Sequence, residues 1–202
     1  ASKKAMLEVE YFSEEGTGLG PTLEFYTIVS SELRKLEHGL WLHESDGAPD
    51  GATHVHAPHG LFPRPIPQRP DGSGLPTRVA QLFSFMGRLV AKALLDNRLV
   101  DLSLAPPFFK HLLGHELTMD DVRALSPHLG RSLGKLATLA SRREAIVRAG
   151  GKPAEVAAAV AALTLDGTSV VDLGFDFTLP GHPSYQLVPG GADKVVDIDN
   201  LA

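Results

Sequence analysis

Cysteine is absent from this 202-residue chain. Its absence excludes disulfide scaffolds, thiolate metal sites and any thiol nucleophile within the chain. Long apolar runs are also absent, because the longest, residues 156–165, is about half of the ~20 residues that a membrane-spanning helix needs. The N-terminus lacks the apolar block and cleavage site of a secretory signal. We therefore expect an intracellular protein, cytoplasmic or nuclear, with no membrane partner.

Positive charge is in the minority. The chain has 19 Lys and Arg against 24 Asp and Glu, a formal net charge of -5, and no basic face is visible in the sequence. This balance gives no electrostatic reason to expect nucleic acid as a partner. Hydrophobic residues make up 43 % of the chain and charged residues 21 %, which is typical of a folded soluble domain. A chain of this length needs neither disulfides nor a metal to fold.

Helical spacing of apolar residues dominates the chain. Thr118 is a good N-cap, and Asp120 and Asp121 follow it in the first turn of a helix. We expect Gly39 to close the first long helix. The pattern predicts helices over residues 23–36, 78–98, 108–113, 129–149 and 154–163, with another beginning at residue 119. Strand-like runs are short and lie at residues 7–12, 170–171, 175–179, 185–188 and 195–198. The predicted fold class is α+β, mostly helical with short β-strands.

Residues 44–76 form a long segment rich in Gly, Pro, Asp and His. A loop of this length is unusual in a compact domain, so we expect it to be flexible, with residues 44–58 the least ordered. The chain stops at Asn200-Leu201-Ala202, where Asn would cap a further helix. We therefore expect a fragment that ends within a domain.

A glycine-rich turn at Gly16, Gly18 and Gly20 follows the first strand-like run and precedes a helix. This order resembles a dinucleotide site, but the third glycine comes one residue early for G-x-G-x-x-G, and Pro21 removes an N–H donor. The preceding run is also half polar, whereas a central parallel strand is apolar on both faces. We expect a structural turn that uses positive φ at its glycines, and no bound cofactor.

Three histidines, His54, His56 and His59, lie close enough in sequence to suggest zinc. No carboxylate or thiol stands at ligand spacing on a rigid element, so we favour solvated loop histidines and predict no metal. His111 and His115 lack the H-E-x-x-H pattern and suit a helix end. No G-x-S-x-G elbow is present, so the sequence offers no site for a serine nucleophile.

Charged residues cluster after the strongest predicted helix, at Asp96, Arg98 and Asp101. They could form a catalytic acid pair. We favour a structural role in which Arg98 bridges the two carboxylates, because charged clusters at helix ends are commonly structural.

Three segments together resemble the HECT domain, the catalytic module of one class of ubiquitin-protein ligases. They are residues 7–36 (LEVEYFSEEGTGLGPTLEFYTIVSSELRKL), 82–109 (LFSFMGRLVAKALLDNRLVDLSLAPPFF) and 171–183 (VDLGFDFTLPGHP). The GTGLGPTLEF and FTLPG forms resemble the branch that contains the yeast ubiquitin-fusion-degradation ligase and its plant and animal relatives. The structural signature residues are Gly16, Gly18, Gly20, Glu24, Asp96, Arg98, Asp101, Asp172 and Gly174.

The resemblance implies that residues 1–202 are the larger part of a HECT N-lobe. It implies that the part that docks the ubiquitin-conjugating enzyme, and the C-lobe with the ubiquitin-accepting cysteine, are absent. The expected partners of the parent ligase are a ubiquitin-conjugating enzyme, ubiquitin and protein substrates, and this chain alone should be inactive. The alternative is a non-catalytic interaction module with a HECT-like scaffold.

Overall fold

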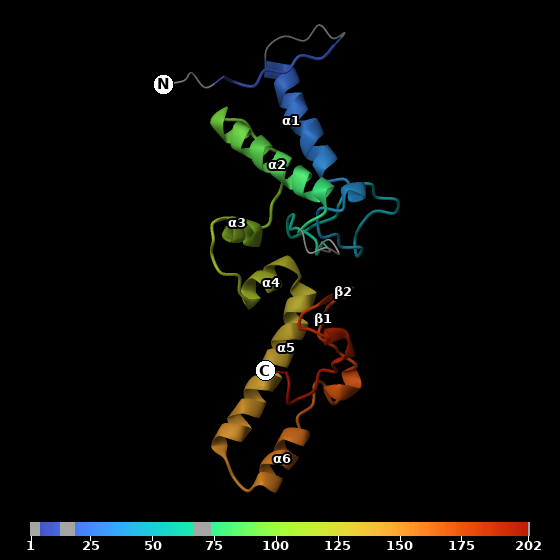
Figure 1. Cartoon of the computed structure of the whole chain (residues 1–202), viewed down its shortest axis with the longest axis vertical. Coiled ribbons are helices and arrows are strands. Elements are labelled where there is room, and N and C mark those ends of the chain that lie inside the picture. The colour runs from blue at the N-terminus through green and yellow to red at the C-terminus, as the bar shows by residue number, and fades with distance from the viewer. Residues whose placement is uncertain (1–4, 13–18, 67–73, 202) are drawn as a thin grey trace. The chain divides into compact units, whose positions relative to one another are not determined.

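The computed structural model describes residues 5–12, 19–66 and 74–201. The chain divides into two compact units, Ala1–Gly114 and His115–Ala202 (Figure 1). Each unit has its own cluster of buried apolar side chains. None of the described helices combines the length and the apolar character needed to cross a membrane.

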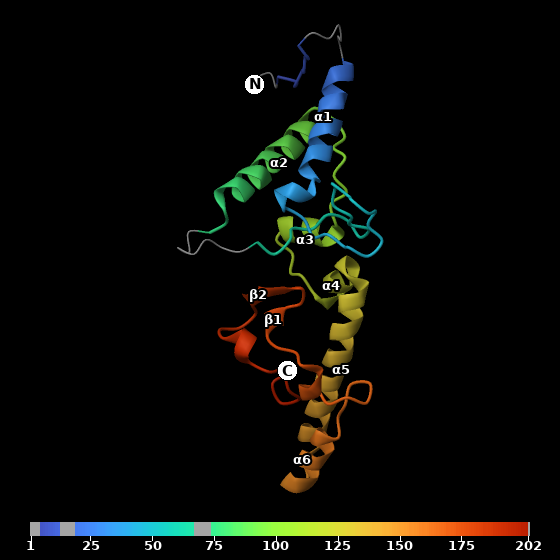
Figure 2. The same cartoon turned by 90° about the vertical axis from the view of Figure 1, so that its right-hand side faces the viewer.

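The N-terminal unit is built on two long helices, α1 (Leu19–Leu33) and α2 (Thr77–Leu95), which lie against each other at an angle in both views (Figures 1 and 2). A short 3-10 helix, η1 (Leu36–His38), follows α1, and α3 (Pro106–Leu112) follows α2. Prolines at the start of α3 suit its first turn, where a backbone N–H has no intrahelical acceptor.

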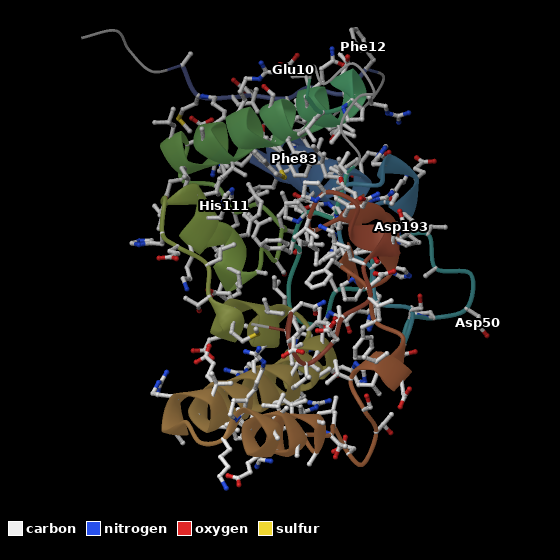
Figure 3. The ribbon with its side chains drawn as sticks, turned by 60° about the horizontal axis from the view of Figure 1, so that its bottom comes forward. Glu10, Phe12, Asp50, Phe83, His111 and Asp193 are labelled. Atoms are coloured by element: carbon white, nitrogen blue, oxygen red, sulfur yellow. The ribbon has the colours of Figure 1, made fainter. Side chains whose placement is uncertain are left out.

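Trp41 organises the core of this unit. Its indole Nε1–H donates to the Leu33 carbonyl at the end of α1, at 2.8 Å. Its ring meets Phe83 of α2 and Phe108 of α3 edge-on, with centroids 5.6 and 6.2 Å apart. Figure 3 labels Phe83 on α2. The Trp41 side chain therefore contacts α1, α2 and α3. Its edge-on aromatic pairs add to the stabilisation that comes from burial.

The long connection between η1 and α2 is hydrogen-bonded to its surroundings in its described part. The Leu36 N–H donates to Thr53 O, and the Val55 N–H donates to Arg34 O, both at 2.9 Å. Asp50, labelled in Figure 3, lies at the outer end of this loop. Residues 67–73 lie outside the described residues. The flexibility expected for residues 44–76 stays a prediction.

The C-terminal unit contains α4 (Met119–Leu125), α5 (Pro127–Ala149) and α6 (Pro153–Ala161). As predicted, Thr118 precedes α4, and the Asp121 carboxylate accepts from the Thr118 N–H at 2.8 Å. Gly150 and Gly151 take positive φ values of 70° and 141° and reverse the chain, so α5 and α6 form a helical hairpin (Figures 1 and 2).

A small β-hairpin completes this unit. Its strands, β1 (Thr178–Leu179) and β2 (His182–Gln186), pair antiparallel. Two 3-10 helices flank it, η2 (Val171–Leu173) and η3 (Gly191–Asp193). Leu139, Val170 and Val196 form the buried cluster of the unit. The predicted fold class, α+β and mostly helical with short strands, is confirmed.

Several predicted boundaries were wrong. Residues 7–12 are not a strand, since none of them enters a described strand pair. Residues 7–11 lack regular structure. The Leu7 and Val9 N–H groups donate to the side chains of Asp96 and Thr22 instead of to a neighbouring strand. The first helix spans Leu19–Leu33 rather than 23–36. It ends early because the Arg34 carbonyl accepts from the Val55 N–H of the loop instead of from a further helical turn. Gly39 therefore closes the short helix η1 and not the first long helix. Val171 belongs to a 3-10 helix, and Val195 makes an isolated bridge with Asp176 instead of a strand.

Candidate functional site

Asp96, at the C-terminal end of α2, joins distant parts of the N-terminal unit. Its side chain is only 3 % exposed and accepts from Lys92 Nζ at 2.8 Å and from the Leu7 N–H at 3.0 Å. Lys92 Nζ also donates to the Ala5 carbonyl. We call Ala5, Leu7, Lys92 and Asp96 the Asp96 junction. It fastens the extended N-terminal segment to the end of α2.

Electrostatics keep the Asp96 carboxylate ionised. The hydrogen bond from Lys92, followed by that from the Leu7 backbone, lowers the pKa of Asp96 below its ordinary value. Tyr26 of α1 lies near this charge. Burial, and secondly the Asp96 carboxylate, raise the pKa of the Tyr26 phenol above its ordinary value. The junction therefore holds one fixed negative charge beside a neutral phenol.

A row of polar residues on α1 lines the same region. Thr22, Tyr26 and Ser30 follow one another at four-residue spacing on one face of α1, and Arg34 comes four positions later, just after the last residue of the helix. Thr22, Tyr26 and Ser30 are buried, at 2, 1 and 0 % exposure. Thr22 Oγ1 accepts from the Val9 N–H at 3.1 Å, and Arg34 donates to Asp101 at 3.4 Å. Thr22 therefore contacts the N-terminal segment, and Arg34 contacts Asp101 in the second signature segment.

The predicted bridging role of Arg98 was wrong. Among the described residues, Asp96 is paired with Lys92 and Asp101 with Arg34. Arg98 lies close enough to lower the pKa of Asp96, yet its buried Nε has no hydrogen-bond partner in the described part of the chain. The two carboxylates thus bind different cations, an arrangement suited to fixing a helix end rather than to acid–base catalysis.

Sequence reasoning missed Lys92, Thr22 and Arg34. Two signals could have found them. Lys92 and Asp96 stand one helical turn apart, where opposite charges meet on a helix surface. Polar residues repeat every four positions from Thr22 to Arg34, which indicates a polar contact along that face.

The other signature residues have separate places. Gly16 and Gly18 lie outside the described residues. Gly20 lies inside α1 without positive φ, and a Cβ added there would meet open space, so the predicted positive-φ turn does not extend to it. Glu24 is exposed on α1. Asp172 lies in η2, and Gly174 ends η2 with a φ of 66°, a conformation that favours glycine.

The loop histidines take part in hydrogen bonds. His54 Nε2 lies 3.1 Å from Ser31 Oγ, and His54 Nδ1 lies 2.9 Å from Thr53 Oγ1. The His56 N–H donates to His43 Nδ1 at 3.0 Å. These contacts fix the loop against the end of α1 and within itself.

A different set of ligand-type side chains meets in the described part of the chain: Glu32, Glu37 and His38. Lys35 lies 2.7 Å from Glu32, and Arg78 lies 3.3 Å from His38 Nδ1. The hydrogen bonds from Lys35 and then His38 lower the pKa of Glu32. Lys35 therefore already pairs with the Glu32 carboxylate, and the positive charge of Arg78 beside the histidine ring opposes a metal ion. We interpret this set as an ion-pair network.

Comparison with known proteins agrees with the three signature segments. A family model described as the HECT-domain (ubiquitin-transferase) matches residues 27–202. The chain therefore belongs to the HECT-domain family.

Named ligases resemble this chain along its whole length. It is 42 % identical over 219 residues to the E3 ubiquitin-protein ligase UPL3 of Arabidopsis thaliana, covering 100 % of this chain and 11 % of that protein. It is 38 % identical over 209 residues to the E3 ubiquitin-protein ligase TRIP12 of Danio rerio, covering 99 % and 10 %. A probable ubiquitin fusion degradation protein of Schizosaccharomyces pombe is 33 % identical over 205 residues, covering 100 % and 11 %. The chain spans about a tenth of the length of these relatives, and the predicted branch is confirmed.

Proposed function

We propose that this chain is the scaffold part of a HECT ubiquitin-protein ligase that transfers ubiquitin through a cysteine thioester to substrate lysines. The observation that carries the proposal is the family match over residues 27–202. The Asp96 junction supports it, because contacts within it link two of the three signature segments. Such a site fixes the geometry of a scaffold and supplies no nucleophile.

The chemistry of the parent protein needs a residue that this chain lacks. A thioester requires a thiolate, and the 202 residues contain no cysteine. The accepting cysteine therefore belongs to another part of the parent protein. A ubiquitin-conjugating enzyme, ubiquitin and protein substrates are its partners in this proposal, and its compartment is the cytoplasm or the nucleus.

Ubiquitin loading of the full parent protein tests the proposal. The parent is incubated with activating enzyme, conjugating enzyme, ATP and labelled ubiquitin, and analysed with and without thiol. We expect a thiol-sensitive ubiquitin adduct that disappears when the accepting cysteine is replaced by alanine. A parent protein that forms no adduct with any of a panel of conjugating enzymes, yet binds other proteins, would support the non-catalytic interaction module instead.

A further inference from the structure

Three side chains from α1 and α2 hold the N-terminal segment by its backbone. The Asp96 carboxylate accepts from the Leu7 N–H at 3.0 Å. Thr22 Oγ1 accepts from the Val9 N–H at 3.1 Å. Lys92 Nζ donates to the backbone carbonyl two residues before Leu7. We call the side chains of Thr22, Lys92 and Asp96 the α1–α2 site.

The N-terminal segment, residues 5–12, alternates between the protein and the solvent. Its side chains at positions 7, 9 and 11 are partly buried, whereas those at positions 6, 8 and 10 are exposed. Leu7 packs against the buried cluster of the unit. Glu10 and Phe12, labelled in Figure 3, lie at the surface. The hydrogen bonds to the α1–α2 site also involve every second residue, which is the pattern of one edge of an extended strand.

The α1–α2 site recognises an extended backbone with an apolar anchor. Its hydrogen bonds go to two N–H groups and one carbonyl, which are groups that extended polypeptide offers along its length. The side chain of Leu7 supplies the contact with the core. In strand addition to a protein, main-chain hydrogen bonds give affinity and alternate side chains give specificity. The α1–α2 site combines the same two features without a sheet.

The N-terminal segment has few contacts that hold it in place. None of its residues belongs to a described strand pair, and five of its eight residues are exposed, at positions 5, 6, 8, 10 and 12. Segments with few buried contacts open locally with much less free energy than a packed core requires. When two copies of a chain exchange such a segment, each site regains the same hydrogen bonds, so the exchange itself loses no contact.

We propose that the α1–α2 site binds the N-terminal segment of a second copy of this chain in exchange for its own. The partner is a second copy because the segment that the site fits is residues 5–12 of the chain itself. The proposal concerns association of the chain with itself and goes beyond the proposed part in ubiquitin transfer.

Two variants of the 202-residue chain test the exchange by complementation. Leu7→Asp keeps the α1–α2 site but impairs the segment, because the new carboxylate would lie beside that of Asp96. The double variant Thr22→Val/Asp96→Asn keeps the segment but removes one acceptor and the charge of the other. At about 0.3 mM of each chain, sedimentation velocity should show a dimer in the mixture that neither variant forms alone.

A peptide of residues 5–12 locates the contact. It is labelled with fluorescein, titrated with the Leu7→Asp chain and followed by fluorescence anisotropy. We expect saturable binding with a Kd of about 0.1 mM. Binding to the wild-type chain should be about fivefold weaker or more, because its own segment competes for the site. A control peptide that is N-methylated at Leu7 and Val9 lacks the two N–H donors and should not bind.

Single substitutions added to the Leu7→Asp chain separate the α1–α2 site from its surroundings. Asp96→Asn and Thr22→Val should each weaken peptide binding about fivefold or more, whereas Glu24→Gln, exposed on α1, should change the Kd less than about twofold. Circular dichroism should show unchanged helix content in these proteins. If Leu7→Asp lowers the helix content, Leu7→Ala replaces it, since it removes the apolar anchor without adding a charge.

Four results would overturn the proposal. They are no dimer in the mixture of variants, no saturable binding of the peptide up to about 1 mM, equal binding of the N-methylated peptide, or equal loss with Glu24→Gln. None of them bears on ubiquitin loading of the parent protein, so the two proposals fail independently.

Discussion

At the scale of single residues, Asp96 joins parts of the chain that are far apart in sequence. Its carboxylate accepts from the backbone of Leu7, 89 positions earlier, and from Lys92 one helical turn before it. A carboxylate that holds both a backbone N–H and an ammonium group must stay ionised to keep both contacts. Removing its charge should therefore loosen the N-terminal segment.

The stability contributed by Asp96 should depend on pH. Its pKa is lowered in the folded protein, so its contribution is complete above the unfolded value of about 3.9 and is lost as the pH falls through the lower folded value. We expect Asp96→Asn to destabilise the chain near neutral pH, with the difference from wild type shrinking in acid. Urea unfolding at a series of pH values measures this.

The control for this experiment is Asp172→Asn, because Asp172 is exposed in η2. It should leave the pH dependence of the urea midpoint unchanged. A constant difference between wild type and Asp96→Asn down to the acid limit would contradict the assigned role of the charge.

Trp41 is the second residue on which the N-terminal unit depends. Trp41→Phe removes the donor to the Leu33 carbonyl and leaves that buried acceptor without it. We expect a loss of about 1–3 kcal/mol in the free energy of unfolding, measured by urea titration with circular dichroism. Phe109→Leu, which trims a half-exposed ring on α3, should cost less. Equal losses would mean that burial alone explains the role of Trp41.

At the scale of elements, the described part of the N-terminal unit depends on close backbone approaches rather than on a sheet. Leu61 makes a parallel bridge with Leu104, and the Leu61 N–H donates to Ser103 O at 2.7 Å. Gly60 stands just before this contact with a φ of 93°. A Cβ at this position would lie 2.8 Å from Ala105 Cα, just before α3.

Gly60→Ala should therefore damage the loop-to-α3 contact. The alanine combines unfavourable φ with a backbone clash, and we expect a loss of about 2–4 kcal/mol in the free energy of unfolding. Gly51→Ala is the matched control, since Gly51 also has positive φ, 71°, but open space around it. It should lose only about 1 kcal/mol. Thermal unfolding that gives the same loss for both variants would exclude the clash as the cause.

At the scale of the whole molecule, the chain is a scaffold built from two units without a thiol. Incubation of the 202-residue chain with activating enzyme, conjugating enzyme, ATP and ubiquitin should give no thiol-sensitive adduct on it, because no side chain can form the thioester. Gel electrophoresis with and without thiol measures this, and the conjugating enzyme's own thioester serves as the positive control. A thiol-sensitive ubiquitin band on the chain itself would contradict the assignment.

Much of the helical architecture could be predicted from the sequence. The apolar stripe of α2 and the cap at Thr118 act within a few residues, so their effect can be predicted from local sequence. The three signature segments, in order, also indicate the family from the sequence alone. The missing cysteine likewise excluded a ubiquitin thioester on this chain, because composition alone decides whether a thiol is present.

Only the tertiary structure decided which residues meet. The alternation of residues 7–12 predicted a strand, but a strand needs a partner backbone, and here side chains of α1 and α2 take the hydrogen bonds. Arg98 looked like the bridging cation because it lies between the carboxylates in sequence, whereas Lys92 and Arg34 reach them in space. Helix packing determines these distances. Sequence spacing determines which residues meet within one helix. Contacts between different elements depend on how these elements pack around the buried core of their own unit.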